Sequence, residues 1–227
     1  VSDFLDLKGK LAKEQTKTYL TYDEKNLYIG IEAKESQMEK VKAEIRKRDG
    51  PVWGDDSIEV FINTNPEDIH YHHLVTNLLG TTFDKKSMDF TPVDWNPEWS
   101  SASTKEKDSW RMEIAIPFEA LGYKTAPPLG TTWDINICRE RHAGKFEGSS
   151  WSYTSGRFHD PHLFGKLIFG TYKDWCASKL EKLSDTIDRK VSLIKKPSKQ
   201  LIASINLLQG RIVEIKKKLK RENSLLL

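Results

Sequence analysis

The chain has 227 residues, of which 37% are hydrophobic and 30% charged, enough for one large domain or for a domain with an appended segment. It has no run of about 18 apolar residues, which excludes a transmembrane helix. The net charge of +3 hides an asymmetry, because residues 1–170 hold 22 Lys and Arg against 27 Asp and Glu, whereas residues 171–227 hold 14 against 6. An acidic body is therefore followed by a basic tail. No N-terminal signal segment is visible, and a start on Val1 indicates a trimmed chain.

Residues 1 to about 170 show the pattern of an all-β domain. Short segments rich in β-branched and aromatic residues are separated by turn signals such as Asn65-Pro66 and Pro127-Pro128. This spacing predicts a mostly β fold, an antiparallel β-sandwich of the jelly-roll kind, with a single helical turn at 118–121. The predicted strands are residues 16–22, 27–33, 41–46, 57–63, 70–77, 81–84, 110–116, 133–138 and 163–169.

The run from Arg48 to Asn63 is the most informative part of the chain. Its first half is a turn in which Trp53 lies between glycines, and its second half has the alternation of a strand. Trp53 either plugs one end of the sandwich or is offered to a ligand. The apolar face of a sugar ring lies flat on an aromatic ring, and its hydroxyl groups then need partners such as the nearby carboxylate of Glu59.

Asp55 and Asp56 stand where this turn meets the strand. Carboxylate oxygens are ligands that Ca²⁺ prefers, so a structural Ca²⁺ is one interpretation. The alternative is a turn in which the carboxylates bind main-chain N–H groups. Two acids alone do not complete a calcium site.

The densest group of histidines lies at residues 70–73. On a strand, His70 and His72 face one side and His73 faces the other. A same-face pair of histidines could bind zinc, but no third ligand is evident from the sequence. A polar strand face that lines a ligand groove is therefore the favoured interpretation.

Catalytic patterns are weak in this sequence. Glu59 and Glu113 lie on different predicted strands, but nothing in their spacing requires an acid and base pair. No nucleophile-and-base pattern, phosphate loop or dinucleotide fingerprint is present, so we predict a non-catalytic protein. Cys138 and Cys176 are predicted to be free thiols, with a disulfide between them as the alternative.

After Lys173 the apolar residues recur at helical spacing. Residues 201, 205, 208, 212, 215 and 219 follow a heptad seam, and an earlier stripe runs from Trp175 to Ile194. Pro197 stands between the stripes, which predicts two antiparallel helices, with one long kinked helix as the alternative. Residues 174–227 are expected to pack, to self-associate or to bind a partner helix. No nucleic-acid partner is expected, because the β region lacks an interleaved basic and aromatic surface.

The run from Arg48 to Asn63 resembles the core motif of carbohydrate-binding module family 9 and its DOMON-like relatives. The resemblance covers residues 1 to about 170 and is silent about residues 171–227, which gives the expected division into two domains. Further segments resemble parts of that family in the same order along the chain: residues 18–29, residues 71–84, residues 110–121, and Phe158-His159-Asp160-Pro161 with Phe164-Gly165-Lys166-Leu167.

The resemblance implies a non-catalytic β-sandwich that binds an oligo- or polysaccharide, often carries structural Ca²⁺, and is attached to a secreted glycanase. A secreted, periplasmic or cell-surface location follows from it, as does a further strand before Val1 that this chain lacks. The implied sugar-binding residues are Trp53 and a second aromatic at Phe158 or Trp151, with Glu59, Asn136 and a histidine, His72 or His73, as hydroxyl partners. Asp55 and Asp56 are implied as metal ligands or loop stabilisers.

Two alternatives from other classes stay open. A haem-binding, DOMON-like electron carrier would need axial ligands, and Met38, Met88 and Met112 do not stand at positions that support one, so haem is not the expected cofactor. A sensor or scaffold would act through its helical tail.

Overall fold

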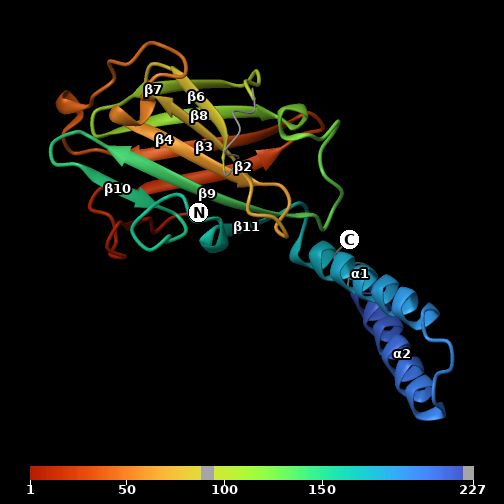
Figure 1. The fold of residues 1–227 in the computed structure, drawn as a ribbon. Helices are drawn as coiled ribbons and strands as arrows, with labels where there is room; N and C mark the ends of the chain where they lie inside the picture. Colours follow the sequence, from red (N-terminus) through yellow and green to blue (C-terminus); the bar gives the residue numbers. More distant parts are fainter. Residues whose placement is uncertain (88–94, 222–227) are drawn as a thin grey trace. The chain divides into compact units, whose positions relative to one another are not determined.

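The computed structural model describes residues 1–87 and 95–221. The chain divides into two compact units, one made of residues 1–126 and 133–167 and the other of residues 127–132 and 168–227. The first unit is built of strands and the second carries two helices (Figure 1). The predicted fold class, a mostly antiparallel β-sandwich with a helical extension, is confirmed.

Strands of the described part of the chain form two sheets. In the larger sheet the order is β1-β10-β9-β4-β5-β6, with β11 also paired to β9, and in the smaller sheet it is β2-β3-β8-β7. The strands are β1 Leu5–Asp6, β2 Thr16–Tyr22, β3 Asn26–Lys34, β4 Ser57–Asn63, β5 Tyr71–Asn77, β6 Thr82–Ser87, β7 Ser100–Lys105, β8 Ser109–Pro117, β9 Thr132–Arg141, β10 Glu147–Ser150 and β11 Gly165–Ile168.

Strand β4 lies at the centre of the larger sheet and is buried on both faces along its whole length. Its inner face, which includes Ile58, meets the smaller sheet. The register pairs Ile58 with Thr76 and with Arg139, and these two side chains reach Ser101 of β7 and the main-chain oxygen of Lys34. The outer face carries Glu59 and Phe61, and residues 156–164 cover it. This outer face is where polar side chains gather.

The predicted strand at residues 41–46 is wrong. The main-chain N–H groups of Lys42, Glu44 and Ile45 do not join a sheet, because they donate to the carboxylates of Asp56 and Asp55. The other predicted strands are present, with bounds shifted by a few residues, and β1, β7 and β10 were not predicted.

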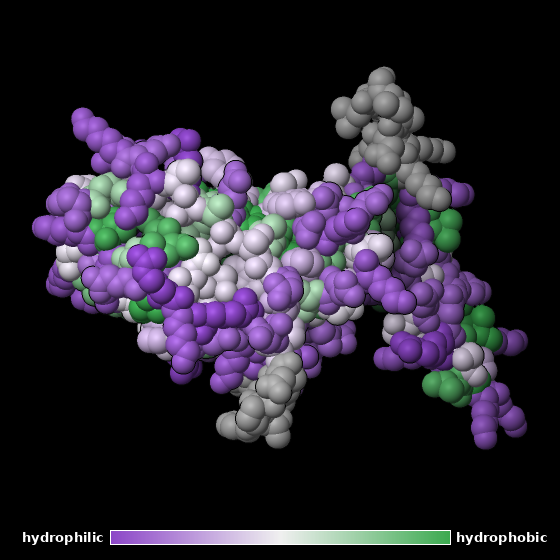
Figure 2. Space-filling view, turned by 90° about the horizontal axis from the view of Figure 1, so that it is seen from above, coloured by the Kyte–Doolittle hydropathy of each residue, from purple (hydrophilic) through white to green (hydrophobic). Residues whose placement is uncertain are grey.

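The second unit contains α1, Tyr172–Ser192, and α2, Lys199–Arg221. Two helices are thus confirmed in place of one kinked helix, and Pro197 lies in the connection between them. The helices run side by side (Figure 1), and Gln209 Nε2 donates to Asp188 Oδ1 at 2.6 Å. Figure 2 shows that some hydrophobic residues are exposed among hydrophilic ones on the surface. Within the described residues, neither helix is apolar enough to span a membrane.

Candidate ligand site

A pocket of about 410 Å³ opens on the outer face of the larger sheet. Strands β4, β5, β6 and β9 supply its floor, residues 156–159 supply one wall, and the turn before β4 supplies Trp53. A second hollow of about 540 Å³, lined by Tyr19 and Tyr28, lies on the outer face of the smaller sheet. More charged and imidazole groups converge in the first pocket than in the second.

Trp53 stands at the edge of this pocket with 43% of its surface exposed. Its ring meets Phe83 of β6 edge to face, with ring centres 5.1 Å apart, and its main-chain oxygen bonds the Nε2 atom of His142. An indole with this exposure does not plug the sandwich. A ligand can therefore reach the ring, and the contact with Phe83 keeps the indole in place.

Glu59 and His73 form a buried pair on the pocket floor. The His73 Nε2 and Glu59 Oε2 atoms are 2.6 Å apart, and the two residues are only 6% and 3% exposed. The His73 ring lies parallel to that of Phe61, with centres 4.3 Å apart. His73 and Glu59 are diagonal neighbours across β4 and β5, since Phe61 is the direct partner of His73 in the register.

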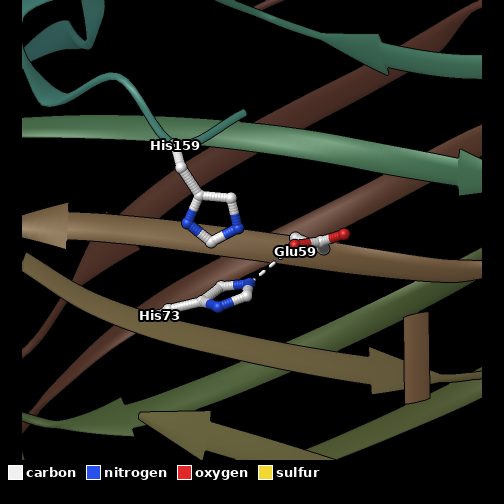
Figure 3. Close-up of side chains that lie close together, drawn as sticks. All are labelled: Glu59, His73 and His159. Carbon is white, nitrogen blue, oxygen red and sulfur yellow. Dashed lines mark hydrogen bonds and ion pairs between the residues drawn. The ribbon is translucent and has the colours of Figure 1, made fainter. Parts of the chain in front are cut away.

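His159 reaches the same point from the covering segment (Figure 3). Its Nδ1 atom bonds the Tyr71 hydroxyl at 2.7 Å, while Nε2 is the ring nitrogen on the side of Glu59. His159 as a whole is exposed, but desolvation of its ring by the surrounding residues, and next the neighbouring His73, lower the pKa of His159. The imidazole is therefore held neutral at physiological pH, with one nitrogen aimed at the carboxylate.

Charge on the pocket floor is set by two carboxylates. Burial, and next the neighbouring Glu59 carboxylate, raise the pKa of Glu140 to about 8. Glu140 can thus keep its proton at neutral pH and donate it in a hydrogen bond. Lys85 and Arg157, both exposed, add positive charge at the pocket. The pocket offers both donors and acceptors for the hydroxyl groups of a ligand.

Four of the predicted sugar-binding residues meet in this pocket: Trp53, Glu59, His73 and Phe158. Phe158 is 7% exposed, because its ring packs in an apolar cluster with Phe61, Tyr71 and Phe164. It therefore presents little surface to the pocket.

His72, Asn136 and Trp151 do not line the pocket. His72 is on the inner face of β5, beside Trp95, where burial lowers its pKa to about 4. Asn136 bonds both the main-chain oxygen and the N–H of Ser152, which anchors the covering segment. Trp151 packs on Gly165, where any side chain would collide with its ring.

Asp55 and Asp56 are fully buried and bind main-chain N–H groups. Asp55 Oδ2 accepts from Glu44, Ile45 and the amide of Asn77 at 2.8–2.9 Å. Asp56 accepts from the N–H groups of Lys42 and His142. These are the contacts of loop-stabilising carboxylates, and Ca²⁺ binding at the two residues stays a prediction.

Several pocket residues were not predicted from the sequence. His159 belongs to the segment that carries part of the family resemblance, but its position gives no sign of the 2.7 Å contact with Tyr71. Lys85 is the direct partner of His73 on the next strand, which brings a cation to the edge of the pocket. Of the methionines considered for haem, Met112 is buried on β8 and Met38 lies in a short helical turn. Met88 lies outside the described residues.

Comparison with known proteins identifies the family. The sequence model described as "Carbohydrate family 9 binding domain-like" matches residues 6–171. The chain is also 28% identical over 158 residues, or 68% of its length, to endo-1,4-beta-xylanase C of Paenibacillus barcinonensis. The match spans only 14% of that enzyme.

Solved structures share the fold. A Bacteroides uniformis structure has a TM-score of 0.60 at 19% identity over 74% of this chain and 86% of that one. A family 9 carbohydrate-binding module from Caldicellulosiruptor kristjanssonii, solved with glucose and with cellotriose, has TM-scores of 0.51 and 0.54 at 15% and 16% identity. These alignments cover 74% and 75% of this chain and 83% and 82% of the module.

Proposed function

The chain belongs to the carbohydrate family 9 binding domain-like family, and from this premise we propose that it binds a glycan in the pocket beside Trp53. Members of this family are non-catalytic binding modules. The observation that carries the proposal is the meeting of a half-exposed tryptophan with buried Glu59 and His73 in one pocket. A small-molecule site usually combines an aromatic surface with a small number of polar groups that point toward the ligand.

In the proposed mode of binding, the Trp53 ring stacks on the C–H face of a sugar residue. Glu59 accepts hydrogen bonds from hydroxyl groups, and Lys85 donates to them at the opposite side of the floor. The Glu59 carboxylate is buried, so a ligand whose hydroxyl does not reach it would leave a carboxylate oxygen without a hydrogen bond from the ligand. The site therefore favours ligands that place a hydroxyl group at Glu59. The volume of about 410 Å³ suits a chain end or a short segment better than a long chain.

The relatives support a choice of ligands for testing this proposal. The family 9 module from Caldicellulosiruptor kristjanssonii was solved with glucose and cellotriose, and the Paenibacillus relative is a xylanase. Cello- and xylo-oligosaccharides are therefore the first ligands to test. We further propose that the chain acts outside the cell, beside or attached to a glycoside hydrolase that it holds near its substrate.

The test is calorimetric titration of cellotriose and xylotriose into the wild-type protein, Trp53→Ala and Tyr19→Ala. Tyr19 is a matched control because it is an exposed aromatic, 59% accessible, beside the hollow of the smaller sheet. Loss of the indole is expected to weaken binding about tenfold or more, and Tyr19→Ala is expected to change nothing. Equal affinity of wild type and Trp53→Ala would remove Trp53 from the site, and a loss in Tyr19→Ala alone would move the site to the smaller sheet.

The helical unit has a separate proposed role in self-association or in binding a partner helix. Leu207, Leu208 and Val213 of α2 are 49–59% exposed, an unusual number of apolar side chains on one helix. Light scattering of the full chain and of a form ending at Phe169 tests this role. The same oligomeric state in both would end the self-association proposal.

A further inference from the structure

We propose that Glu59, His73 and His159 form a binding site for a divalent transition-metal ion, with Zn²⁺ as the ion that fits the ligands best. The three side chains come from β4, from β5 and from the covering segment, and their ligand atoms all lie within 4.8 Å of one another (Figure 3). All three line the pocket on the outer face of the larger sheet. The proposal stands on this convergence and does not depend on glycan binding.

The ligand chemistry selects the metal. Two imidazole nitrogens and one carboxylate oxygen suit zinc, whereas calcium takes oxygen ligands in larger number. Ligand atoms around a tetrahedral zinc lie about 3.3 Å apart, since each is about 2.0–2.2 Å from the ion. The Glu59 and His73 atoms, now 2.6 Å apart, would separate slightly, and the His159 nitrogen, which lies within 4.8 Å of them, would approach by up to about 1.5 Å.

Residues behind the ligands hold them in the required orientation. The Tyr71 hydroxyl bonds Nδ1 of His159, which leaves Nε2 on the side of Glu59. The Phe61 ring, stacked on His73, restricts the rotation of that imidazole. Such supports of metal-bound histidines fix the ring and its tautomer.

Three protein ligands leave a fourth position of a tetrahedral ion open to the pocket. A water molecule would fill it in the absence of a ligand. If the proposed function holds, a sugar hydroxyl over Trp53 would replace this water, so the ion would tighten glycan binding. This last step rests on the proposed function, whereas the metal site does not.

The experiment is a calorimetric titration of Zn²⁺ into chelator-treated full-length protein. The variants are His73→Asn, His159→Asn and Tyr71→Phe, with His162→Asn as the matched control, since His162 is an exposed histidine of the same segment. Wild type and the control are expected to bind one ion with the same affinity. His73→Asn and His159→Asn are expected to lose about 100-fold or more, and Tyr71→Phe about 10-fold. Thermal melting of each variant identifies any that do not fold.

Absence of zinc binding by the wild type, or unchanged affinity in His159→Asn, would overturn the proposal. Absorption of the Co²⁺-loaded protein gives a second readout, because an intense visible band reports tetrahedral nitrogen and oxygen ligands and should vanish in His159→Asn. Titration of cellotriose with and without Zn²⁺ separates the two proposals. Glycan binding by a protein that takes up no zinc would defeat only the metal site, and zinc binding without glycan binding would defeat only the proposed function.

Discussion

Glu35 and Arg141 form a buried bidentate ion pair between the two sheets of the sandwich. The Arg141 Nε and Nη2 atoms lie 2.7 Å and 2.8 Å from the two carboxylate oxygens of Glu35. Glu35 directly follows β3 of the smaller sheet, and Arg141 ends β9 of the larger. Arg139 adds a contact to Glu35 at 3.1 Å and lies over the Trp110 ring. One carboxylate thus holds two guanidinium groups of β9 against the smaller sheet.

Removal of this carboxylate should destabilise the first unit strongly. Glu35→Ala leaves two buried guanidinium groups without their carboxylate partner, and we expect the free energy of unfolding to fall by about 3–5 kcal/mol. Urea denaturation followed by tryptophan fluorescence measures it. Glu106→Ala is the control, because Glu106 and its partner Arg111 are exposed and such pairs are worth about 1 kcal/mol or less. A similar small loss in both variants would contradict the prediction.

Asp55 should be essential to the turn that carries Trp53. Asp55→Ala leaves the N–H groups of Glu44 and Ile45 and the Asn77 amide without their acceptor, and unsatisfied buried donors cost about 1–3 kcal/mol each. We expect a loss of about 3 kcal/mol or more in urea denaturation. The calcium prediction is tested in the same assay, since EGTA would lower the urea concentration at the unfolding midpoint of the wild type only if Ca²⁺ is bound.

Much of the sandwich can be predicted from the sequence because its central strands follow a simple pattern. The burial of β3 alternates along its whole length, and β4 is rich in β-branched residues. Apolar and polar residues also alternate at residues 41–46. Their N–H groups, however, donate to two carboxylates 10–14 positions further on and not to a neighbouring strand, and the alternation gives no sign of these carboxylates. Strand β10, Glu147–Ser150, consists of small and polar residues, so its pairing with β9 is set by neighbours and not by its own propensity.

The site is less predictable than the fold, because it depends on contacts between distant segments. Period two places His73 and His72 on opposite faces of a strand, but it does not say which face is the outer one. Asn136 is of a residue type that can bind sugar hydroxyl groups, but its amide bonds the main chain of Ser152. The hydrogen bond between Tyr71 and His159 joins residues that are 88 positions apart, and it depends on the path of the covering segment.

Gly210 of α2 should be a position where stability can be gained. A Cβ there would meet no atom within 4 Å, and glycine in a helix interior costs about 1 kcal/mol relative to alanine. We expect Gly210→Ala to raise the thermal stability of the helical signal in circular dichroism. Gly130→Ala, in the same unit, should have the opposite effect, because Gly130 has a φ of +85° and a Cβ would collide with Asp174 and Ser178. An unchanged or lowered midpoint in Gly210→Ala would contradict the prediction.

The start of α1 should depend on pH through Asp174. This carboxylate accepts from the N–H and hydroxyl groups of Thr171, both at 2.7 Å, and the first of these bonds is the main cause of its lowered pKa. Because the pKa is lower in the folded state, the cap contributes its full stability above the ordinary value of 3.8 and loses it as the pH falls through the folded value.

The measurement is an NMR titration of the Thr171 amide between neutral and acid pH. We expect its resonance to shift with a midpoint below 3.8, and amide exchange in the first turn of α1 to accelerate over the same range. Asp174→Asn, which keeps the size of the side chain but cannot titrate, should show neither change. A midpoint at or above 3.8 in the wild type, or the same profile in both proteins, would mean that the cap seen in the structure does not hold the helix in solution.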